Sequence, residues 1–397
     1  MFVNANKTPG KSDNESISLA IAEAKLMGKN KVVIPKHNDR TDSDLWVIED
    51  TIYLPNDIEI LVDDAHLMLA DNVYCNMFAN ASVSGTKDRT LADEQYGITI
   101  RGEGNAVLDG GNYNGLSERN SEKDGRPHIS KNTTLLFVNC RNVTVENISI
   151  TNQRWWGITN IYVRDSYFGN LCIRSDYSRF ADGVHYPGEE PGNYDEIYIK
   201  NSDGIDLRVG CNNILIENIT GYAEDDMIAL TALGIFEKRL GYYVSDKDDD
   251  ISDVTIKNIT ADSSCSLIRL LCNHGKKVYN VTIDGVNDTK DEKRNITAPY
   301  AIRISDKKGR YKAPDGCLMR KGDIKNITVR NVVSKCKYGV ALYNELCNIK
   351  IENVTAIKGV ALAAPEDEVC TVYGLETNNL RTMEDPAKVR CGEIIVK

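Results

Sequence analysis

Apolar residues follow one repeated pattern along much of the chain. Six segments carry apolar residues at a first position, two positions after it and five positions after it: NVTVENIS (142–149), NILIENIT (213–220), DVTIKNIT (253–260), NVTIDGVN (280–287), NITVRNVV (326–333) and NIKIENVT (348–355). In the first copy these are Val143, Val145 and Ile148. Alternation over two residues is the pattern of a β-strand with one buried face. The sequence therefore predicts strands that recur along the chain.

The three-residue step inside each copy predicts a bend. In a straight strand this step would turn the third apolar side chain to the opposite face. The residue at the bend is Asn in five copies and Gly285 in the remaining one. Both residue types tolerate the left-handed backbone that such a bend needs. Strand, bend and strand form the cross-section of a coil, so we predict an all-β fold, a right-handed, single-stranded parallel β-helix.

The spacing of the copies predicts the length of a coil. First apolar positions fall at residues 143, 214, 254, 281, 327 and 349, so successive intervals are 71, 40, 27, 46 and 22 residues. The two shortest intervals suit single coils, and the longer ones suit several coils or one coil with an inserted loop. A solenoid of helices is the rival fold, but the Val, Ile and Thr that dominate these segments disfavour helix. We expect stacked parallel strands from about residue 50 to 355.

Both ends of the chain depart from the repeat. From about 14 to 28, apolar residues recur at helical spacing and Gly28 follows as a stop signal. We expect this helix to cap the coil stack, whose terminal coil would otherwise expose apolar surface and unpaired strand edges. Residues from about 357 to 397 lose the repeat, which predicts an irregular closing segment. The whole chain, 1–397, is expected to form one β-helix domain.

Composition and charge argue against several classes of partner. No run of about 18 apolar residues is present, so we expect no membrane association. The formal net charge of -10 and a pI near 5.2, without a basic stripe, argue against nucleic acid as a partner. The 11 cysteines are scattered and form no CxxC pair. We therefore expect mostly reduced core residues rather than a disulfide framework.

The N-terminal segment bears on localisation. MFVNANKTPGKSDNESISLA contains no continuous apolar core of the kind that a secretory signal requires. We expect a cytoplasmic protein if Met1 is native, and otherwise a secreted or periplasmic protein whose signal has been removed. The oligomeric state does not follow from the sequence.

Two acidic clusters stand out, Asp203 and Asp206 in NSDGID and Glu224, Asp225 and Asp226 in AEDDMIAL. Asp203 and Asp225 are 22 residues apart, which equals the shortest repeat interval, so strands about 4.8 Å apart would carry the clusters side by side. Like charges so close raise the pKa of one group. Glycoside hydrolysis uses such a pair: a protonated carboxyl donates to the leaving oxygen while an ionised one activates water or attacks the sugar. The alternatives are a calcium site or solvated turn residues; for hydrolysis we predict neither a metal nor a cofactor.

The segments around these acids resemble the polygalacturonase-like glycoside hydrolases, family 28 of the pectin-degrading β-helix group. NSDGID is similar to that family's NTDGID, and AEDDMIAL is similar to its GDDCIAL. Residues 126–158 resemble its segment of RP, an apolar strand, an NV repeat and a Trp. The opening stretch TPGKSDNESISLAIAEA is similar to the start and first helix of the wider group. The resemblance covers about residues 95 to 305.

This resemblance implies roles for the acids and for one arginine. Asp225 would be the general acid, and Asp203 with Asp226 would position and activate water, in a single displacement with inversion at the sugar carbon. Arg303 in AIRIS corresponds to the family arginine that grips a substrate carboxylate. A planar guanidinium suits that role because it can bind a carboxylate through two hydrogen bonds. A surface arginine at a strand end is the alternative.

Two positions depart from the family pattern. Cys265 stands where the family has the His of GHG, and Ser305 stands where it has a Lys after the arginine. Both family residues bind sugar or adjust protonation, so their loss predicts weak or no cleavage of plain polygalacturonan. Arg269, Lys307 or Lys308 could replace the lost positive charge.

Further residues are candidates for binding substrate. Asp206 lies in the first acidic cluster, and Asp182 and His185 in ADGVHYPG lie about one coil before Asp203, where they would line the same groove. Trp156 could stack on a sugar ring, although one residue of an adjacent Trp pair usually points into the core.

Three functions are compatible with the sequence. The first is a glycoside hydrolase that cleaves a pectin-like or other uronide-containing oligo- or polysaccharide. The second is a polysaccharide lyase or epimerase on the same scaffold, which needs a base beside a carboxylate and often calcium to neutralise that group. The third is a β-helix that only binds glycans, against which the acidic triad argues. In each case the expected partner is an oligo- or polysaccharide.

Overall fold

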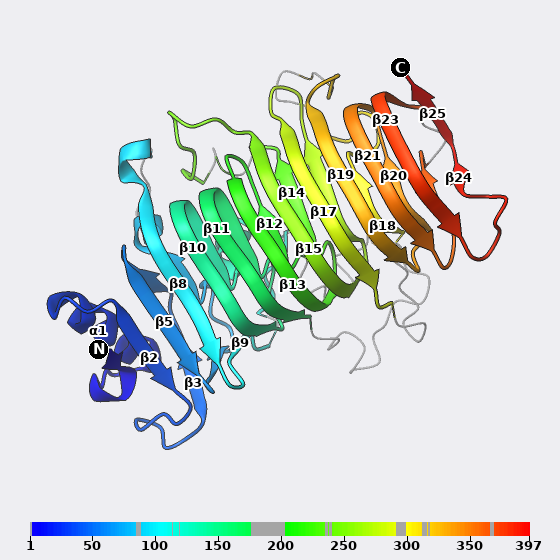
Figure 1. Ribbon diagram of the computed structural model, residues 1–397. Helices are drawn as coiled ribbons and strands as arrows, with labels where there is room; N and C mark the ends of the chain where they lie inside the picture. Colours follow the sequence, from blue (N-terminus) through cyan, green and yellow to red (C-terminus); the bar gives the residue numbers. More distant parts are fainter. Residues whose placement is uncertain are drawn as a thin grey trace.

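Strands stacked in parallel along one axis form the molecule (Figure 1). The computed structural model describes residues 2–84, 89–112, 114–118, 120–175, 203–234, 237, 240–290, 299–311, 316, 318–365 and 369–397. In this part of the chain, 25 strands join in one sheet that coils upon itself. The predicted all-β fold, a parallel β-helix, is confirmed.

The longest row of strands contains the repeated segments and begins near the N-terminus. It comprises β1 (Val3–Asn4), β2 (Lys31–Pro35), β5 (Ile58–Asp63), β8 (Gln95–Glu103), β10 (Leu135–Thr151), β11 (Ile158–Arg174), β13 (Asn212–Ala223), β15 (Ile251–Ser263), β17 (Val278–Asp288), β19 (Ile324–Ser334), β21 (Glu345–Ala356), β23 (Val369–Thr382) and β25 (Glu393–Val396).

Two further rows close the coils. The first joins the start of β10 and β11 to β4 (Ile52–Leu54), β7 (Phe78–Asn80), β12 (Ile205–Leu207), β14 (Ile228–Ala232), β16 (Ser266–Cys272), β18 (Tyr300–Ile304), β20 (Tyr338–Leu342), β22 (Val360–Ala363) and β24 (Arg390–Cys391). The second joins the end of β10 to β3 (Leu45–Ile48), β6 (His66–Leu69) and β9 (Val107–Asp109). Short 3-10 helices are η1 (Ala5–Lys7), η2 (Ala81–Ser84), η3 (Leu91–Asp93) and η4 (Ile129–Asn132).

The apolar residues of the repeat form the core. All of them, from Val143 to Val354, are buried with no more than 2% of their surface exposed. The register stacks equivalent residues: Ile214 lies opposite Val254, which lies opposite Val281. Parallel strands buried in this way need such apolar positions. The inward orientation predicted for the repeat is confirmed.

The predicted bends are present in every copy. The Asn residues at the bends have φ between 53° and 60°, and Gly285 has φ 81°. A second left-handed residue, which the sequence analysis does not anticipate, precedes the first apolar position of each copy. Its φ lies between 51° and 55°, and it is Asn in five copies and Asp253 in the sixth. The Asn side chains bond from coil to coil, as Asn258 does to Asn218 at 3.1 Å.

The unequal intervals have two causes. The interval of 71 residues contains an additional coil, because β11 lies between β10 and β13 and Ser166 is opposite Ile214. The intervals of 40 and 46 residues are single coils with inserted residues, because β13 pairs directly with β15 and β17 pairs directly with β19.

The N-terminal helix lies where it was predicted. Helix α1 (Asp13–Leu26) begins after Ser12, whose side chain accepts a hydrogen bond from the Glu15 N–H. The residues that recur at helical spacing are buried against the first strands; they are Ile17, Ala20, Ile21 and Ala24. Figure 1 shows α1 at the end of the stack that carries the N-terminus. Among the residues described, no helix combines the length and the apolar character needed to cross a membrane.

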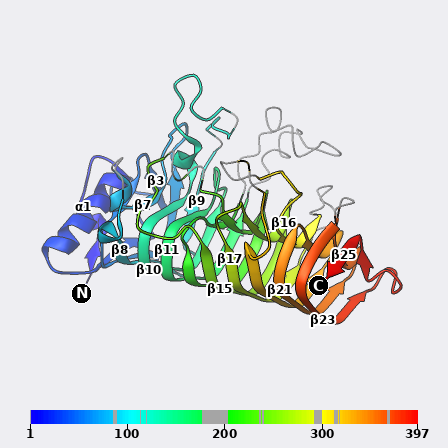
Figure 2. The same ribbon diagram turned by 90° about the horizontal axis from the view of Figure 1, so that it is seen from above.

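The prediction of an irregular segment from 357 to 397 is wrong. Strands β22 to β25 continue the stack, and β23 pairs with β21 with Leu375 opposite Ile349. The repeat was not recognisable there because Thr377 takes an apolar position, opposite Ile351. Figure 2 shows the strands in succession along one axis, from α1 at one end to β25 at the other.

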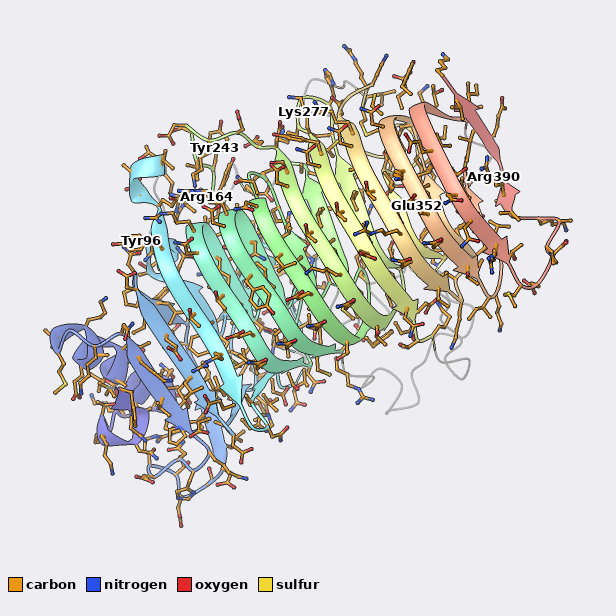
Figure 3. The ribbon with its side chains drawn as sticks, in the orientation of Figure 1. Tyr96, Arg164, Tyr243, Lys277, Glu352 and Arg390 are labelled. Carbon is orange, nitrogen blue, oxygen red and sulfur yellow. The ribbon has the colours of Figure 1, made fainter. Side chains whose placement is uncertain are left out.

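The outer face of the longest row is polar (Figure 3). Arg164 pairs with Glu94 at 2.7 Å, Glu352 pairs with Lys350 at 3.2 Å, and the Arg141 guanidinium lies 4.7 Å from the centre of the Tyr96 ring. This face is a charged, solvated surface. The acidic clusters of the sequence analysis lie instead at the row that contains β12 and β14.

Candidate active site

The acidic clusters precede two paired strands. Strands β12 and β14 pair with Ile205 opposite Ile228. Asp203 and Asp226 each stand two residues before these partners, so they lie at the same level on neighbouring coils. The offset between paired residues is 23 here, which makes Asp226 rather than Asp225 the counterpart of Asp203. The clusters are side by side, as predicted, with a register that differs by one residue.

The backbone fixes this arrangement. The Gly204 N–H donates to the Asp226 carbonyl oxygen at 2.9 Å, and the Asp226 N–H donates to Asp203 Oδ1 at 2.9 Å. A Cβ atom at Gly204 would lie 2.6 Å from the Met227 carbonyl oxygen, which no real side chain tolerates. The glycine of NSDGID therefore allows the two acidic segments to approach each other.

Asp225 is the most exposed of the three acids. It is half-buried, whereas Asp203 is 8% and Asp226 is 2% exposed. Ser263 holds the next coil close, because its Oγ donates to the Asp225 carbonyl and accepts from the Cys265 N–H. An oxygen of Asp225, an oxygen of Asp226 and Cys265 Sγ all lie within 4.8 Å of one another.

The surroundings of Asp225 favour its protonated form. Burial raises the pKa of Asp225 to about 7, and the neighbouring charge of Asp226 acts in the same direction. The positive charge of Arg269 and a hydrogen bond from the Cys265 side chain oppose this rise. A carboxyl that titrates near neutrality and is partly accessible can donate a proton to a bound molecule.

Asp203 and Asp206 form a buried layer behind this carboxyl. Burial raises the pKa of both well above the usual range, and the neighbouring carboxylates raise that of Asp203 further. Arg208 lowers the pKa of Asp206 and is itself paired with Glu237 at 2.9 Å. Asp206 has no exposed surface, which argues against the predicted contact with a sugar. It acts on Asp203 instead.

Two arginines extend the site onto the following coils. Arg269 on β16 and Arg303 on β18 lie opposite each other. Arg269 Nη1 is 3.3 Å from Asp226 Oδ2, and its Nη2 is 2.5 Å from Asp306 Oδ2. Arg303 Nη2 also donates to Asp306. The structure thus brings Arg269 to the acids and places Arg303 beside it on the next coil. The two arginines are joined by the carboxylate of Asp306, which the sequence analysis did not single out.

Ser305 does not replace the lysine of the family pattern. It is buried, its Oγ donates to Met319 Sδ at 3.4 Å, and it accepts a hydrogen bond from Asn344 at 2.8 Å. Of the cations considered as replacements, Arg269 reaches the acids. Lys307 contributes its backbone N–H to Asp306 at 2.6 Å.

Trp156 is largely covered by neighbouring side chains. Its ring stacks on Trp155 with 3.6 Å between centroids, and the Arg208 guanidinium lies 4.8 Å from its centre. Only 7% of its surface is exposed. Both tryptophans pack with Leu116 and Ile129, so little ring surface is left for stacking on a sugar. Asp182 and His185 lie outside the described residues.

Sequence reasoning missed Asp306. Its only signal is its place three residues after Arg303, and outside a helix this separation does not by itself indicate a pair. Asp306 is 2% exposed and stands between two arginines of different coils, a relation that depends on the register.

One group of described residues could hold a metal ion: Asp225, Asp226 and Cys265. A set that includes sulfur suits Zn²⁺ or a related transition metal better than Ca²⁺, which binds six to eight oxygens. Burial raises the pKa of the Cys265 thiol well above its usual range, and the two neighbouring carboxylates raise it further. Without a metal the thiol therefore stays protonated, and a metal bound here would have to displace that proton.

Comparisons with known proteins identify the fold. No family model matches the sequence, and no curated protein matches it either. Among solved structures, a polygalacturonase from Erwinia carotovora ssp. carotovora is 12% identical with a TM-score of 0.57, covering 98% of this chain and 94% of that one. The A-module of a mannuronan C-5 epimerase from Azotobacter vinelandii is 10% identical with a TM-score of 0.55, covering 99% and 95%.

A third similar structure is an endo-xylogalacturonan hydrolase from Aspergillus tubingensis, 14% identical with a TM-score of 0.52, covering 100% of this chain and 95% of that one. Identities this low bear on the fold and not on the chemistry. Each comparison covers almost the full length of both chains. The protein therefore has the right-handed parallel β-helix fold of these polysaccharide-active proteins.

Proposed function

We propose that the protein is a glycoside hydrolase that cleaves a glycosidic bond in a pectin-like or other uronide-containing oligo- or polysaccharide. The observation that carries this proposal is the half-buried carboxyl of Asp225, whose pKa burial raises to about 7, next to the buried carboxyl groups of Asp203 and Asp226. A hydrolase of this type needs one protonated and one ionised carboxyl at the same bond. The fold shared with a polygalacturonase and an endo-xylogalacturonan hydrolase supports the choice of substrate class.

In the proposed reaction, Asp225 donates its proton to the oxygen of the leaving sugar. Asp226, with Asp203 behind it, takes a proton from the attacking water. Arg269 pairs with Asp226 at 3.3 Å, whereas burial raises the pKa of Asp225 to about 7. The proton on Asp225 and the ion pair of Asp226 with Arg269 suit the two carboxyls to opposite roles.

The resemblance implies inversion at the sugar carbon, and the spacing of the acids makes this worth testing. Inverting pairs usually stand about 6.5 to 9.5 Å apart, which leaves room for a water, and retaining pairs stand about 5 to 5.5 Å apart. The nearest oxygens of Asp225 and Asp226 lie within 4.8 Å. The separation is closer to that of a retaining pair, so the stereochemistry of the product tests the implied inversion. Proton NMR of the first-formed product anomer distinguishes inversion from retention.

The test of the proposal is a screen of pectic and related oligosaccharides with detection of new reducing ends. Asp225→Asn should lower kcat by about 10²- to 10⁴-fold, because the amide keeps the shape but cannot donate the proton. The control is Asp284→Asn, which removes a carboxylate paired with Arg330 elsewhere on the coils. Wild-type turnover by a folded Asp225→Asn variant would show that Asp225 is not the acid.

A lyase or epimerase is the second candidate, favoured by the fold shared with the mannuronan C-5 epimerase. Such a reaction needs a base to remove a proton beside a carboxylate. Arg269 contacts Asp226, and Arg208 is near enough to lower the pKa of Asp206; both arginines stay protonated and are poor bases. A product that absorbs in the ultraviolet through a new double bond would identify a lyase, and a changed sugar without cleavage would identify an epimerase.

A further inference from the structure

The buried carboxylate of Asp306 binds Arg269 and Arg303, the two arginines that extend the site. Asp306 is 2% exposed; one of its oxygens accepts from Arg269 and the other accepts from Arg303. Arg269 also contacts Asp226, so the sequence of charges across the coils is Asp226, Arg269, Asp306, Arg303. Two negative and two positive groups alternate, and their charges cancel.

The backbone holds Asp306 in this position. The preceding residue, Ser305, has φ 69°, a left-handed conformation that is rare for a residue with a side chain. The Lys307 N–H donates to Asp306 Oδ1, and Asn344 Nδ2 donates to the Asp306 carbonyl oxygen at 2.6 Å. A strained residue and two hydrogen bonds therefore fix the carboxylate against the arginines.

The two arginines have little surface left for a ligand. Arg269 is 9% and Arg303 is 5% exposed. The Arg303 guanidinium lies 4.6 Å from the centre of the Tyr300 ring, and that of Arg269 lies 5.4 Å from the centre of Tyr311. Aromatic rings and one carboxylate thus cover the groups that would bind an acidic sugar.

A third arginine touches the same carboxylate from outside. Arg310 Nη1 is 3.7 Å from Asp306 Oδ1, and its side chain is 56% exposed. Solvent weakens the attraction of such an exposed charge for an anion. Arg310 therefore does not substitute for the two covered guanidinium groups.

An acidic sugar at this place would have to compete with Asp306. If the sugar carboxylate displaced Asp306, the displaced group would stay buried without its cations, which is costly. If it bound in addition, it would add a third carboxylate around Arg269, next to Asp226 and Asp306. Both outcomes disfavour a charged sugar unit, whereas a neutral unit meets neither cost.

We propose that Asp306 is a specificity-determining residue, which makes the surface next to Arg269 and Arg303 a site for an uncharged sugar unit. That unit is a neutral sugar or an esterified uronide, within a chain whose other units can be acidic. This inference rests on the proposed function and narrows its substrate class. It also gives the predicted weakness towards plain polygalacturonan a physical cause, because every unit of that polymer carries a carboxylate.

The test compares the binding of two probes that differ in charge, a short hexuronide and its methyl ester. The comparison is repeated with hexuronides of different sugar configuration. Calorimetry on the Asp225→Asn background prevents turnover and gives the ratio of affinities for acid and ester. Asp306→Asn should raise the acid-to-ester ratio by about tenfold, because it frees the arginines for a charged hydrogen bond. Asp284→Asn, which removes a carboxylate paired with Arg330, should leave the ratio unchanged.

A second variant, at Arg303, tests whether the ligand or Asp306 binds this arginine. Arg303→Met should lower the ratio by much less than tenfold, because Asp306 and not the ligand binds Arg303 and only the net charge of the surroundings changes. A tenfold fall of the ratio in this variant, or no rise in a folded Asp306→Asn variant, would overturn the inference and leave the proposed function intact. If Asp306→Asn does not fold, the Arg303→Met result decides alone. Failure of every probe to bind would overturn both proposals.

Discussion

Asp203, Asp225 and Asp226 carry the same chemical group in three different surroundings. Asp225 is half-buried, whereas Asp226 is buried and contacts Arg269. Burial raises the pKa of Asp203, and the carboxyls around it raise this pKa further. The division of roles proposed for them follows from these surroundings and from nothing in the side chains themselves.

The pH dependence of activity follows from Asp225. A general acid works only while protonated, and burial raises the pKa of Asp225 to about 7. We therefore expect kcat/KM to fall as the pH rises through about 7. Rates on the best substrate of the screen, measured across this range, test the prediction. A falling limb near pH 4, where an ordinary carboxyl titrates, would contradict it.

Cys265 should affect the pH at which kcat/KM falls, which is the falling limb of the pH profile. Its hydrogen bond lowers the pKa of Asp225. Cys265→Val keeps similar bulk without the donor, so the pKa should rise and the limb should move to higher pH. Cys265→Ser keeps a donor and serves as the control, with little expected movement. A shift to lower pH in the Val variant would show that Cys265 acts on Asp225 in another way.

Single residues also show where sequence reading stops. The motifs around Asp203 and Asp225 could be recognised because they are short and contiguous. Asp306 could not, because its contact with Arg269 joins two adjacent coils and depends on the left-handed backbone of Ser305. The burial of Asp206 and Trp156 likewise depends on neighbours from other coils.

At the scale of elements, the repeat predicted those strands whose three inward positions are all apolar. Strand β11 escaped because Ser166 takes the first of them, where its hydroxyl accepts from the Val143 N–H at 3.0 Å and donates to the Arg164 carbonyl at 2.8 Å. A polar residue whose hydrogen bonds are made within the coils can replace an apolar one. Such compensation cannot be seen in the sequence. Strand β23 was not predicted for a similar reason, because Thr377 takes one of its apolar positions.

The bends of the strands allow a direct test of stability. Asn258 has φ 55° and donates to Asn218. Asn258→Ala should lower the free energy of unfolding by about 1 to 3 kcal/mol, since it loses this bond and keeps a strained backbone. Asn258→Gly should cost less, because glycine adopts the conformation freely. Unfolding in urea measures both values.

The next coil supplies the control for this test. Gly285 occupies the equivalent bend with φ 81°. Gly285→Ala imposes the backbone strain without the loss of a side-chain hydrogen bond, so its cost should lie below that of Asn258→Ala. Equal stability of all the variants and the wild type would show that the bends do not depend on residue type.

At the scale of the whole molecule, one apolar core runs through the described coils, from Val3 near the N-terminus to Val372 on β23. We therefore propose that 1–397 is a single domain and expect one calorimetric unfolding transition. Its van't Hoff enthalpy should agree with the calorimetric enthalpy. Two separate transitions would divide the chain, as happens when long repeat arrays lose cooperativity.

The constant register of coils with unequal lengths has a consequence for how such a chain can change over generations. Paired residues on adjacent coils are 40, 46 and 22 positions apart at Ile214, Val281 and Ile327, yet the strands stay aligned. Doubling the length of an inserted segment raises the free energy of closing that loop by only about 0.6 kcal/mol, through the loss of chain entropy. Descendants of this chain can therefore lengthen or shorten the turns between strands while Asp203 keeps its position relative to Asp226. The proposed catalytic geometry can then persist while the length of the turns changes.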